Sequence, residues 1–307
     1  MDVSIIIVNY NTLDILKNCL NSIFEQTVEV KYEIIVVDNA STDGSQQMIK
    51  ENFPQITLIE NKLNLGFGSA NNLGAKIAKG KYLLLLNSDC LLIENTIKVF
   101  YDFMEMNNID GSIGVIGAML YDKMMKPNNS YHKFPIIGTS LKVIIISFYN
   151  KLFLQSIALP KTSNYNQSKY SNEVDFISGA DLFISKKIFD ELNGFDEQFF
   201  LFFEETDLQK RMAKKGLKRI ILRNQKIIHL EGHSSKTSTP SVKLFLIYRD
   251  SMYKYFRKNA SFISYNFFYY LTIPLVIVPL LSKKYSGKEK KRYLKKLLRI
   301  PINEPWL

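Results

Sequence analysis

Short apolar runs alternate with helix-forming patterns from residue 3 to residue 86, and this alternation constrains the fold more than any other feature. Asn11-Thr12 is expected to cap the first helix, and Asp43-Gly44 to open the second. This order predicts an α/β fold with a mostly parallel central sheet covered by helices on both faces. Strands are predicted at residues 3–8, 33–37, 56–59 and 82–86, and helices at 13–24, after Gly44 and at 70–78.

The second half of the chain has weaker patterns. Residues 121–172 show no clear period, but an apolar stretch at 139–159 is expected to form a helix lying over the site or on lipid. Beyond it the patterns predict a strand over 176–184, helices near 186–192 and 204–215, and a strand at 219–222.

The charge of the chain is concentrated at its C-terminus. The net charge is +11, and the segment from Lys283 to Arg299 is rich in lysine and arginine. This position favours an anionic membrane surface over a nucleic-acid groove, although a solubilising helix face is the simpler alternative. Cys19 and Cys90 are far apart and fit neither a disulfide framework nor a zinc site. No signal peptide is visible, so a cytoplasmic location is expected.

An uncharged run precedes this basic tail. Residues 262–281 are as long as the roughly 20 residues that a helix needs to span a bilayer core. However, the run contains Pro274 and Pro279, its first half is aromatic, and basic residues flank both ends. We therefore expect residues 241–307 to form a helical segment that associates peripherally or re-entrantly with the inner face of the membrane. The alternative, that these residues form a helical appendage packed on the core, is given about equal weight.

Polar residues stand where three predicted strands end. They are Asn9-Tyr10-Asn11, Asp38-Asn39 and Asn87-Ser88-Asp89. Open parallel sheets bind ligands beyond the carboxyl ends of their strands, so these residues are the first candidates for a binding site.

An ordered series of short motifs resembles glycosyltransferase family 2, and most closely its bacterial rhamnosyltransferase-like branch. The series covers roughly residues 3 to 235. It consists of VSIIIVNYN at 3–11, VVDNASTDGS at 36–45, NLGFGSANN at 64–72, LLLNSD at 84–89, Gly179-Ala180, GFD at 194–196 and FEETDL at 203–208.

The resemblance implies a GT-A fold over residues 1–240, with a nucleotide-binding half at about 1–120 and an acceptor half at about 121–240. In this family the residue matching Asp38 accepts a hydrogen bond from the pyrimidine base, and Val8, Asn9 and Tyr10 line that base. A simple turn cap is the structural alternative for Asp38. Asn64, Gly66 and Gly179 are further donor-binding candidates. For Gly66 a tight strand-to-helix turn explains the glycine equally well.

The family also implies a divalent metal, Mg²⁺ or Mn²⁺, on the diphosphate of the donor. Asp89 is the expected ligand, while Asn87 replaces the first aspartate of the family motif and can still bind ribose or phosphate. His229 is the second metal candidate, against the alternative of a loop histidine bound to backbone. His233 is expected to have no such role.

The resemblance places the catalytic base at Glu205, with Glu204 as the alternative. Such a base takes the proton of the acceptor hydroxyl as that oxygen attacks the anomeric carbon. Asp207 is expected to be structural, since Arg211 follows four residues later on the same helix.

The predicted function is therefore inverting transfer of a sugar from a dTDP- or UDP-linked donor, with rhamnose as one candidate, to a hydroxyl of a lipid-linked glycan or polysaccharide precursor. A catalytically silent nucleotide-sugar-binding scaffold at the membrane is the competing hypothesis, and the departures at Asn87 and Glu205 keep it open. A dehydrogenase is disfavoured because residues 9–12 lack the glycine fingerprint.

Overall fold

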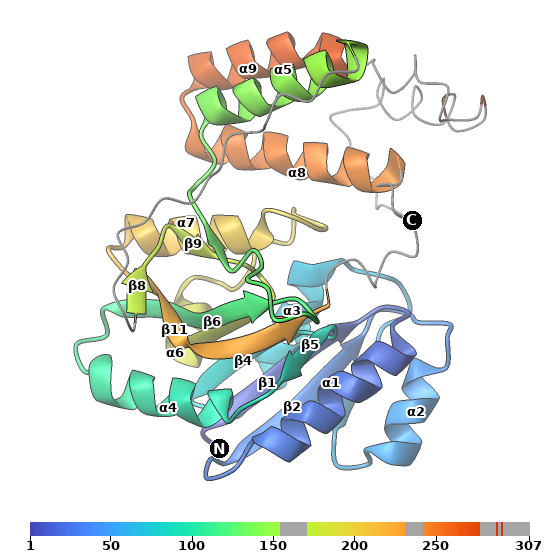
Figure 1. The fold of residues 1–307 in the computed structure, drawn as a ribbon, viewed down its shortest axis with the longest axis vertical. Helices are drawn as coiled ribbons and strands as arrows, with labels where there is room; N and C mark the ends of the chain where they lie inside the picture. The colour runs from blue at the N-terminus through green and yellow to red at the C-terminus, as the bar shows by residue number, and fades with distance from the viewer. Residues whose placement is uncertain (154–170, 231–241, 277–286, 288–289, 291–307) are drawn as a thin grey trace. The chain divides into compact units, whose positions relative to one another are not determined.

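The computed structural model describes residues 1–153, 171–230, 242–276, 287 and 290, and the chain divides into two compact units (Figure 1). The first unit comprises Met1–Phe134 and Ser163–Ser238, and the second comprises Pro135–Thr162 and Thr239–Leu307. The first contains a large sheet with helices on both faces, and the described part of the second is helical.

Four parallel strands form the first half of the sheet, as predicted. Their spatial order is β3 (Thr57–Glu60), β2 (Tyr32–Asp38), β1 (Val3–Asn9) and β4 (Tyr82–Asn87). The connecting helices are α1 (Leu13–Gln26), α2 (Ser45–Asn52) and α3 (Phe67–Ile77). All four carboxyl ends therefore lie at one edge of the sheet.

The second half of the sheet is mixed. It continues from β4 through β10 (Asp181–Ser185), β6 (Ile113–Tyr121), β11 (Lys218–His229) and β5 (Cys90–Leu92), with β8 (Ser171–Glu173) beside β11. β10 is antiparallel to both neighbours, whereas β11 is parallel to β6. Most paired residues of the sheet are still in parallel pairs, so the expected α/β architecture is confirmed in a mixed form. A separate small sheet joins β7 (Tyr131–His132) and β9 (Phe176–Ile177).

Both faces of the sheet are covered, which explains why its central strands are apolar at most positions. In β1, Ile5 and Ile7 pack in a core with α1, α2 and α4 (Thr96–Asn107). Ile6 points to the opposite core, shared with α3, α6 (Lys186–Glu191) and α7 (Glu204–Lys214).

Three local predictions are wrong in detail. The single strand expected over 176–184 is two strands, β9 and β10, because a turn at Gly179 and Ala180 separates them. The strand expected at 219–222 extends to His229, because a register shift between Leu222 and Lys226 absorbs the polar interruption. Thr12 stands at the predicted N-cap position of α1, but its hydroxyl donates to Asn9 instead of capping the helix, and the Leu13 amide donates to the Asp43 carboxylate at 2.9 Å.

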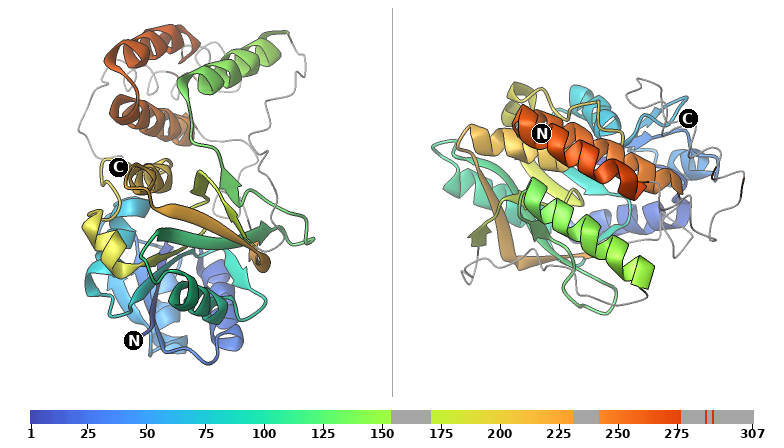
Figure 2. Two further views of the ribbon diagram at one scale, coloured as in Figure 1. Left: turned by 90° about the vertical axis from the view of Figure 1, so that its left-hand side faces the viewer. Right: turned by 90° about the horizontal axis from the view of Figure 1, so that it is seen from above.

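The second unit contains α5 (Ile137–Phe153), α8 (Val242–Asn259) and α9 (Phe262–Val276), and α9 contacts both other helices (Figure 2). Tyr253 and Thr272 share a 2.7 Å hydrogen bond between α8 and α9, and Phe268 stacks edge-on against Tyr253. None of the helices in the described ranges is long and apolar enough to cross a membrane. Residues 154–159 and 277–281 of the two predicted apolar segments, His233 and most of the basic tail lie outside the described residues.

Candidate active site

The structure brings the three predicted strand ends together. Asn9 is in register with Asp38 across β1 and β2, and Val8 is in register with Asn87 across β1 and β4. Val8 and Asn87 are half-buried, whereas Tyr10 is 49% exposed just beyond the edge. This edge therefore presents amide, carboxylate and aromatic groups side by side.

Asp38 is fully buried and already has internal partners. Its Oδ2 accepts a hydrogen bond from Asn9 Nδ2 at 2.8 Å. Its Oδ1 accepts one from the Ser41 amide at 2.8 Å and another from Gln46 Nε2 at 2.6 Å. The turn-capping alternative is thus directly visible. Oδ1 thus accepts two hydrogen bonds, so a ligand donor can take a place on this oxygen only if one of those two donors moves away.

The buried amide of Asn9 links β1 to the end of β4. Thr12 Oγ1 donates to Asn9 Oδ1 at 2.5 Å and lies 3.1 Å from Ser88 Oγ. Asn9 Nδ2 also donates to Ser41 Oγ at 3.0 Å. The side chain of Asn9 therefore orders the strand ends rather than standing open to a ligand.

Gly66 is required by a close backbone approach. Its φ is +85°, and a Cβ atom at this position would lie 2.1 Å from the carbonyl oxygen of Phe200. The Phe67 amide donates to that same oxygen at 3.0 Å, and Asn64 Oδ1 accepts from the Gly66 amide at 2.9 Å. The tight-turn explanation accounts for this glycine, because two backbone amides of the loop have protein partners.

Asp89 and His229 meet although they lie far apart along the chain. Asp89 Oδ1 is 3.2 Å from His229 Nε2, and both residues are almost completely buried. Two features of the sheet produce this contact: Cys90 is in register with His229, and the Leu230 amide donates to the Asp89 carbonyl at 2.9 Å. The two predicted metal ligands therefore form one pair.

This donor set fits a divalent cation. Asp89, Cys90 and His229 offer ligand atoms that all lie within 4.8 Å of one another. Burial raises the pKa of the Cys90 thiol well above its usual range, and the thiol donates to the Ala180 carbonyl at 3.5 Å, so it is a poor ligand. A carboxylate oxygen and an imidazole nitrogen remain. Such a pair can contribute two ligands to a divalent cation.

Glu204 and Glu205 begin helix α7 but have different surroundings. Glu204 is 3% exposed, and its Oε2 has no hydrogen-bond partner within the described residues. Burial and the neighbouring Glu205 raise the pKa of Glu204 well above its usual range. Glu205 is half-buried, and burial raises its pKa as well. A Cβ atom on Gly179 would lie 3.4 Å from Glu205 Cγ, so Glu205 lies against the turn between β9 and β10.

The backbone just before these carboxylates is strained. Phe202 and Phe203 have φ values of +69° and +68°, a region that bulky residues rarely adopt. Such strain persists only where surrounding contacts hold it, and it is concentrated at functional sites. The loop that leads into α7 therefore needs firm anchors.

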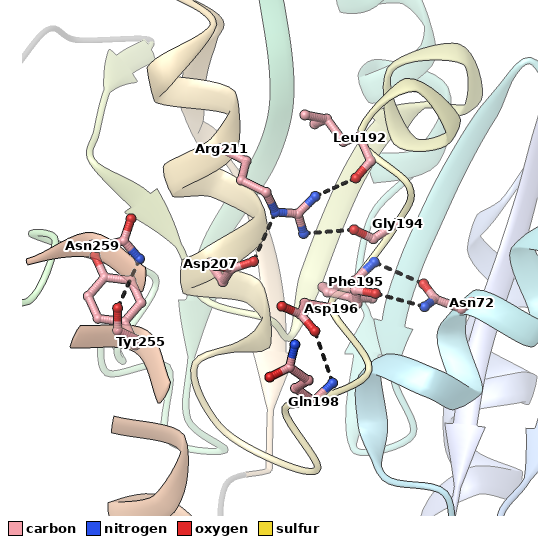
Figure 3. A network of polar contacts seen from close by, with 10 residues as sticks. All are labelled: Asn72, Leu192, Gly194, Phe195, Asp196, Gln198, Asp207, Arg211, Tyr255 and Asn259. Atoms are coloured by element: carbon pink, nitrogen blue, oxygen red, sulfur yellow. Dashed lines mark hydrogen bonds and ion pairs between the residues drawn. The ribbon is translucent and has the colours of Figure 1, made fainter. Parts of the chain in front are cut away.

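Figure 3 shows two of these anchors. Asn72 of α3 donates to the carbonyl of Phe195 and accepts from its amide, both at 2.9 Å. Arg211 of α7 pairs with Asp207 at 2.9 Å and donates to the carbonyls of Leu192 and Gly194. The structural role expected for Asp207 is confirmed by this pairing.

Replacing Arg211 with methionine should lower the free energy of unfolding by about 3 kcal/mol, because it leaves the Asp207 carboxylate buried without its cation. Denaturant unfolding measures this loss. The matched control is Lys186→Met, whose partner Asp190 is 56% exposed, and which should cost less than about 1 kcal/mol. Equal losses for the two variants would contradict the anchoring role.

Two residues near the site were not predicted. Gln46 gave no signal, because a glutamine in the first turn of a helix is ordinary. Asp181 is a carboxylate within an apolar strand, which is a detectable signal. It is fully buried, accepts a hydrogen bond from the Ala118 amide and interacts electrostatically with His229. Burial raises the pKa of Asp181 to about 8, so its neutral form predominates at pH 7.

Comparison with known proteins adds an independent line of evidence. The family model "Glycosyl transferase family 2" matches residues 4–189. A relative covered over nearly its whole length is rhamnosyltransferase WbbL of Escherichia coli, 25% identical over 274 residues, or 86% of this chain and 96% of the relative. N-acetylglucosaminyl-diphospho-decaprenol L-rhamnosyltransferase of Mycobacterium tuberculosis is 24% identical over 217 residues, with 66% of this chain and 67% of the relative covered.

Other relatives are longer than this chain. Poly(ribitol-phosphate) beta-glucosyltransferase of Bacillus spizizenii is 36% identical over 119 residues, and the match spans 37% of this chain but only 19% of that protein. Among solved structures, S. aureus TarS 1-349 in complex with UDP superposes with a TM-score of 0.54 at 15% identity, covering 97% of this chain and 71% of that one. This likeness shows a common fold, the GT-A-like α/β architecture.

Proposed function

The chain belongs to glycosyltransferase family 2, and on that premise we propose that it moves a sugar from a nucleotide-activated donor to an acceptor hydroxyl, with inversion at the anomeric carbon. One arrangement carries the proposal. The Ala180 carbonyl accepts a hydrogen bond from the Asn87 amide at 2.9 Å, and the adjacent Gly179 faces Glu205. The Gly179-Ala180 turn thus connects the strand end that leads into Asp89 with the half-buried carboxyl of Glu205.

The donor is proposed to bind at the edge formed by β1, β2 and β4. Asp38 accepts from the base beside Val8, Asn9 and Tyr10, and the loop around Asn64 and Gly66 closes the same side. Asn87 and Gly179 contact ribose, phosphate or sugar. Asp89 and His229 hold Mg²⁺ or Mn²⁺, which when bound neutralises charge on the departing diphosphate.

Glu205 is proposed as the general base. It accepts the proton of the acceptor hydroxyl while that oxygen attacks the anomeric carbon from the side opposite the diphosphate. A single displacement of this kind needs no nucleophilic side chain. The raised pKa of Glu205 supports the assignment, since a base whose pKa lies closer to neutral takes a proton more effectively. Glu204 is more deeply buried and is the alternative.

The relatives guide the choice of substrates. Two relatives are named rhamnosyltransferases, and the name of one of these two includes a diphospho-decaprenol-linked sugar. We therefore propose a dTDP- or UDP-sugar donor and a lipid-linked or polysaccharide acceptor. Residues 1–240 would form the transferase domain, with the nucleotide-binding half at 1–120 and the acceptor half at 121–240. Residues 241–307 would dock the enzyme on the cytoplasmic face of the membrane.

Helix α9 supplies the surface for this docking. Ile263, Phe267 and Leu271 follow one another at helical spacing and are 81%, 63% and 42% exposed. Phe268 and Thr272 on the other side are buried within the second unit. Arg257 and Lys258 at the end of α8 are exposed, and each basic residue near an anionic surface contributes roughly 1 kcal/mol.

Glutamate at both Ile263 and Phe267 should weaken binding to anionic vesicles by about 10-fold or more, because burial of each side chain is worth roughly 1.5–3 kcal/mol. Liposome flotation of the full chain at low and high salt measures this. Ile109→Glu is the matched control, since Ile109 is 89% exposed in the first unit. Unchanged flotation of the double variant would assign membrane binding, if present, to other residues.

The proposed function is tested with a panel of nucleotide sugars, with and without Mn²⁺, by thermal shift and then by transfer to a lipid-linked acceptor. Donor-dependent stabilisation together with transfer supports the enzyme. Stabilisation without transfer or donor hydrolysis would instead favour the silent scaffold.

A further inference from the structure

The side chain of Gln46 donates a hydrogen bond to the Asp38 carboxylate, which the nucleotide base is proposed to use. Its Nε2 lies 2.6 Å from Asp38 Oδ1, the shorter of the two hydrogen bonds that this oxygen accepts. Hydrogen bonds to a charged acceptor are the strong ones. The side chain of Gln46 is half-buried, and Asp38 beneath it is fully buried.

Of the three donors to Asp38, only Gln46 can leave at small cost. Asn9 is itself completely buried, and its amide also bonds Ser41 Oγ at 3.0 Å while its oxygen accepts from Thr12. The Ser41 donor is a backbone amide within the turn. Gln46 stands in the first turn of α2, where a change of side-chain rotamer leaves the helix backbone in place.

We propose that Gln46 is an internal competitor for the base: it holds Asp38 Oδ1 in the free protein and must swing away before a uracil or thymine base donates to that oxygen. This inference rests on the proposed function, in which Asp38 receives the base. The glutamine amide presents an N–H donor, as does the imide of uracil or thymine. The exchange replaces one N–H···O hydrogen bond by another, so Asp38 remains satisfied in both states.

The competitor also affects selectivity among bases. Uracil and thymine carry an N–H at ring position 3, whereas the same position of cytosine is a hydrogen-bond acceptor. Cytosine has no donor at that position and gains nothing by displacing Gln46, so a cytidine nucleotide is expected to bind with Gln46 still bonded to Asp38. Uridine and thymidine nucleotides gain from removal of the competitor, and cytidine nucleotides do not.

The test is isothermal titration of the full chain with UDP, dTDP and CDP in the presence of Mn²⁺. Gln46→Ala should bind UDP and dTDP roughly 10-fold more tightly than the parent chain, in line with loss of one competing charge-assisted hydrogen bond. Its affinity for CDP should not rise. Gln46→Ser, with a shorter side chain, should give the same pattern and guards against a folding defect of one variant.

Gln47→Ala is the matched control. Gln47 is the neighbouring glutamine on the same helix, but it is exposed and its Nε2 bonds Glu51 at 2.5 Å, away from Asp38. Unchanged or weaker binding of UDP by both Gln46 variants would overturn the proposal, and so would an equal gain for CDP. If the parent chain binds none of the three nucleotides, the proposed function itself fails, an outcome distinct from failure of the role of Gln46.

Discussion

Replacing Glu205 with glutamine should reduce sugar transfer by roughly 10²–10⁴-fold while donor binding stays intact. The amide keeps the shape of the side chain against Gly179 but cannot accept a proton. The measurement is single-turnover transfer, with donor affinity determined separately by titration. A loss confined to the chemical step is the signature of a missing general base.

Glu204→Gln is the comparison that decides between the two carboxyls. Burial and the neighbouring Glu205 raise the pKa of Glu204 and so disfavour its proton-accepting form, and Glu204→Gln should therefore retain much more turnover than Glu205→Gln. The opposite result would move the base to Glu204. The pH profile gives a second check: a base acts when deprotonated, so a raised pKa of Glu205 shifts the loss of activity on acidification to a higher pH than for an ordinary glutamate.

Replacing Asp89 with alanine should abolish metal-dependent binding of the nucleotide diphosphate. The change removes the only carboxylate of the Asp89–Cys90–His229 group and leaves His229 without its partner at 3.2 Å. The loss of Mn²⁺ affinity should exceed the roughly 10–100-fold that removal of an outer-shell partner costs. Titration of Mn²⁺ with UDP present measures the effect.

Variants of two neighbouring residues, His229 and Cys90, serve as comparisons for Asp89→Ala. His229→Ala should weaken Mn²⁺ binding in the same direction, because it removes the imidazole ligand. Cys90→Ser should leave Mn²⁺ affinity nearly unchanged, since the buried thiol is protonated and bonded to the Ala180 carbonyl. If the Asp89 variant kept full metal dependence, Asp89 would not be a metal ligand. A large effect of Cys90→Ser would show that the thiol is one.

Because position 87 carries no carboxylate, the proposed metal site depends more strongly on the pair Asp89 and His229. Asn87 is half-buried at the end of β4 and contributes no charge. A cation at this edge would depend on Asp89 for its carboxylate and on the strand pairing that brings His229 to it. The pairing of β5 with β11 is thus as important for the proposed site as the identity of either ligand.

The sequence alone determined the parallel half of the sheet and the edge at which the candidate site lies. Largely apolar strands separated by amphipathic helices must be covered on both faces, and parallel strands place their carboxyl ends at one edge. Asn9, Asp38 and Asn87 could therefore be grouped before any coordinates. The pairing of Asp207 with Arg211 was likewise predictable, because residues four apart on a helix are neighbours.

Only the tertiary structure decided which side chains meet across distant segments. The contact of Asp89 with His229 depends on an antiparallel strand pair and on the register shift in β11, which no local pattern encodes. Position 66 needs a glycine because the carbonyl of Phe200 lies too close for a side chain. Gln46 donates a hydrogen bond to Asp38 Oδ1 from a different segment of the chain. Local propensities act over a few residues, whereas side-chain contacts between remote segments follow from register and packing, and these are defined only once the sheet has formed.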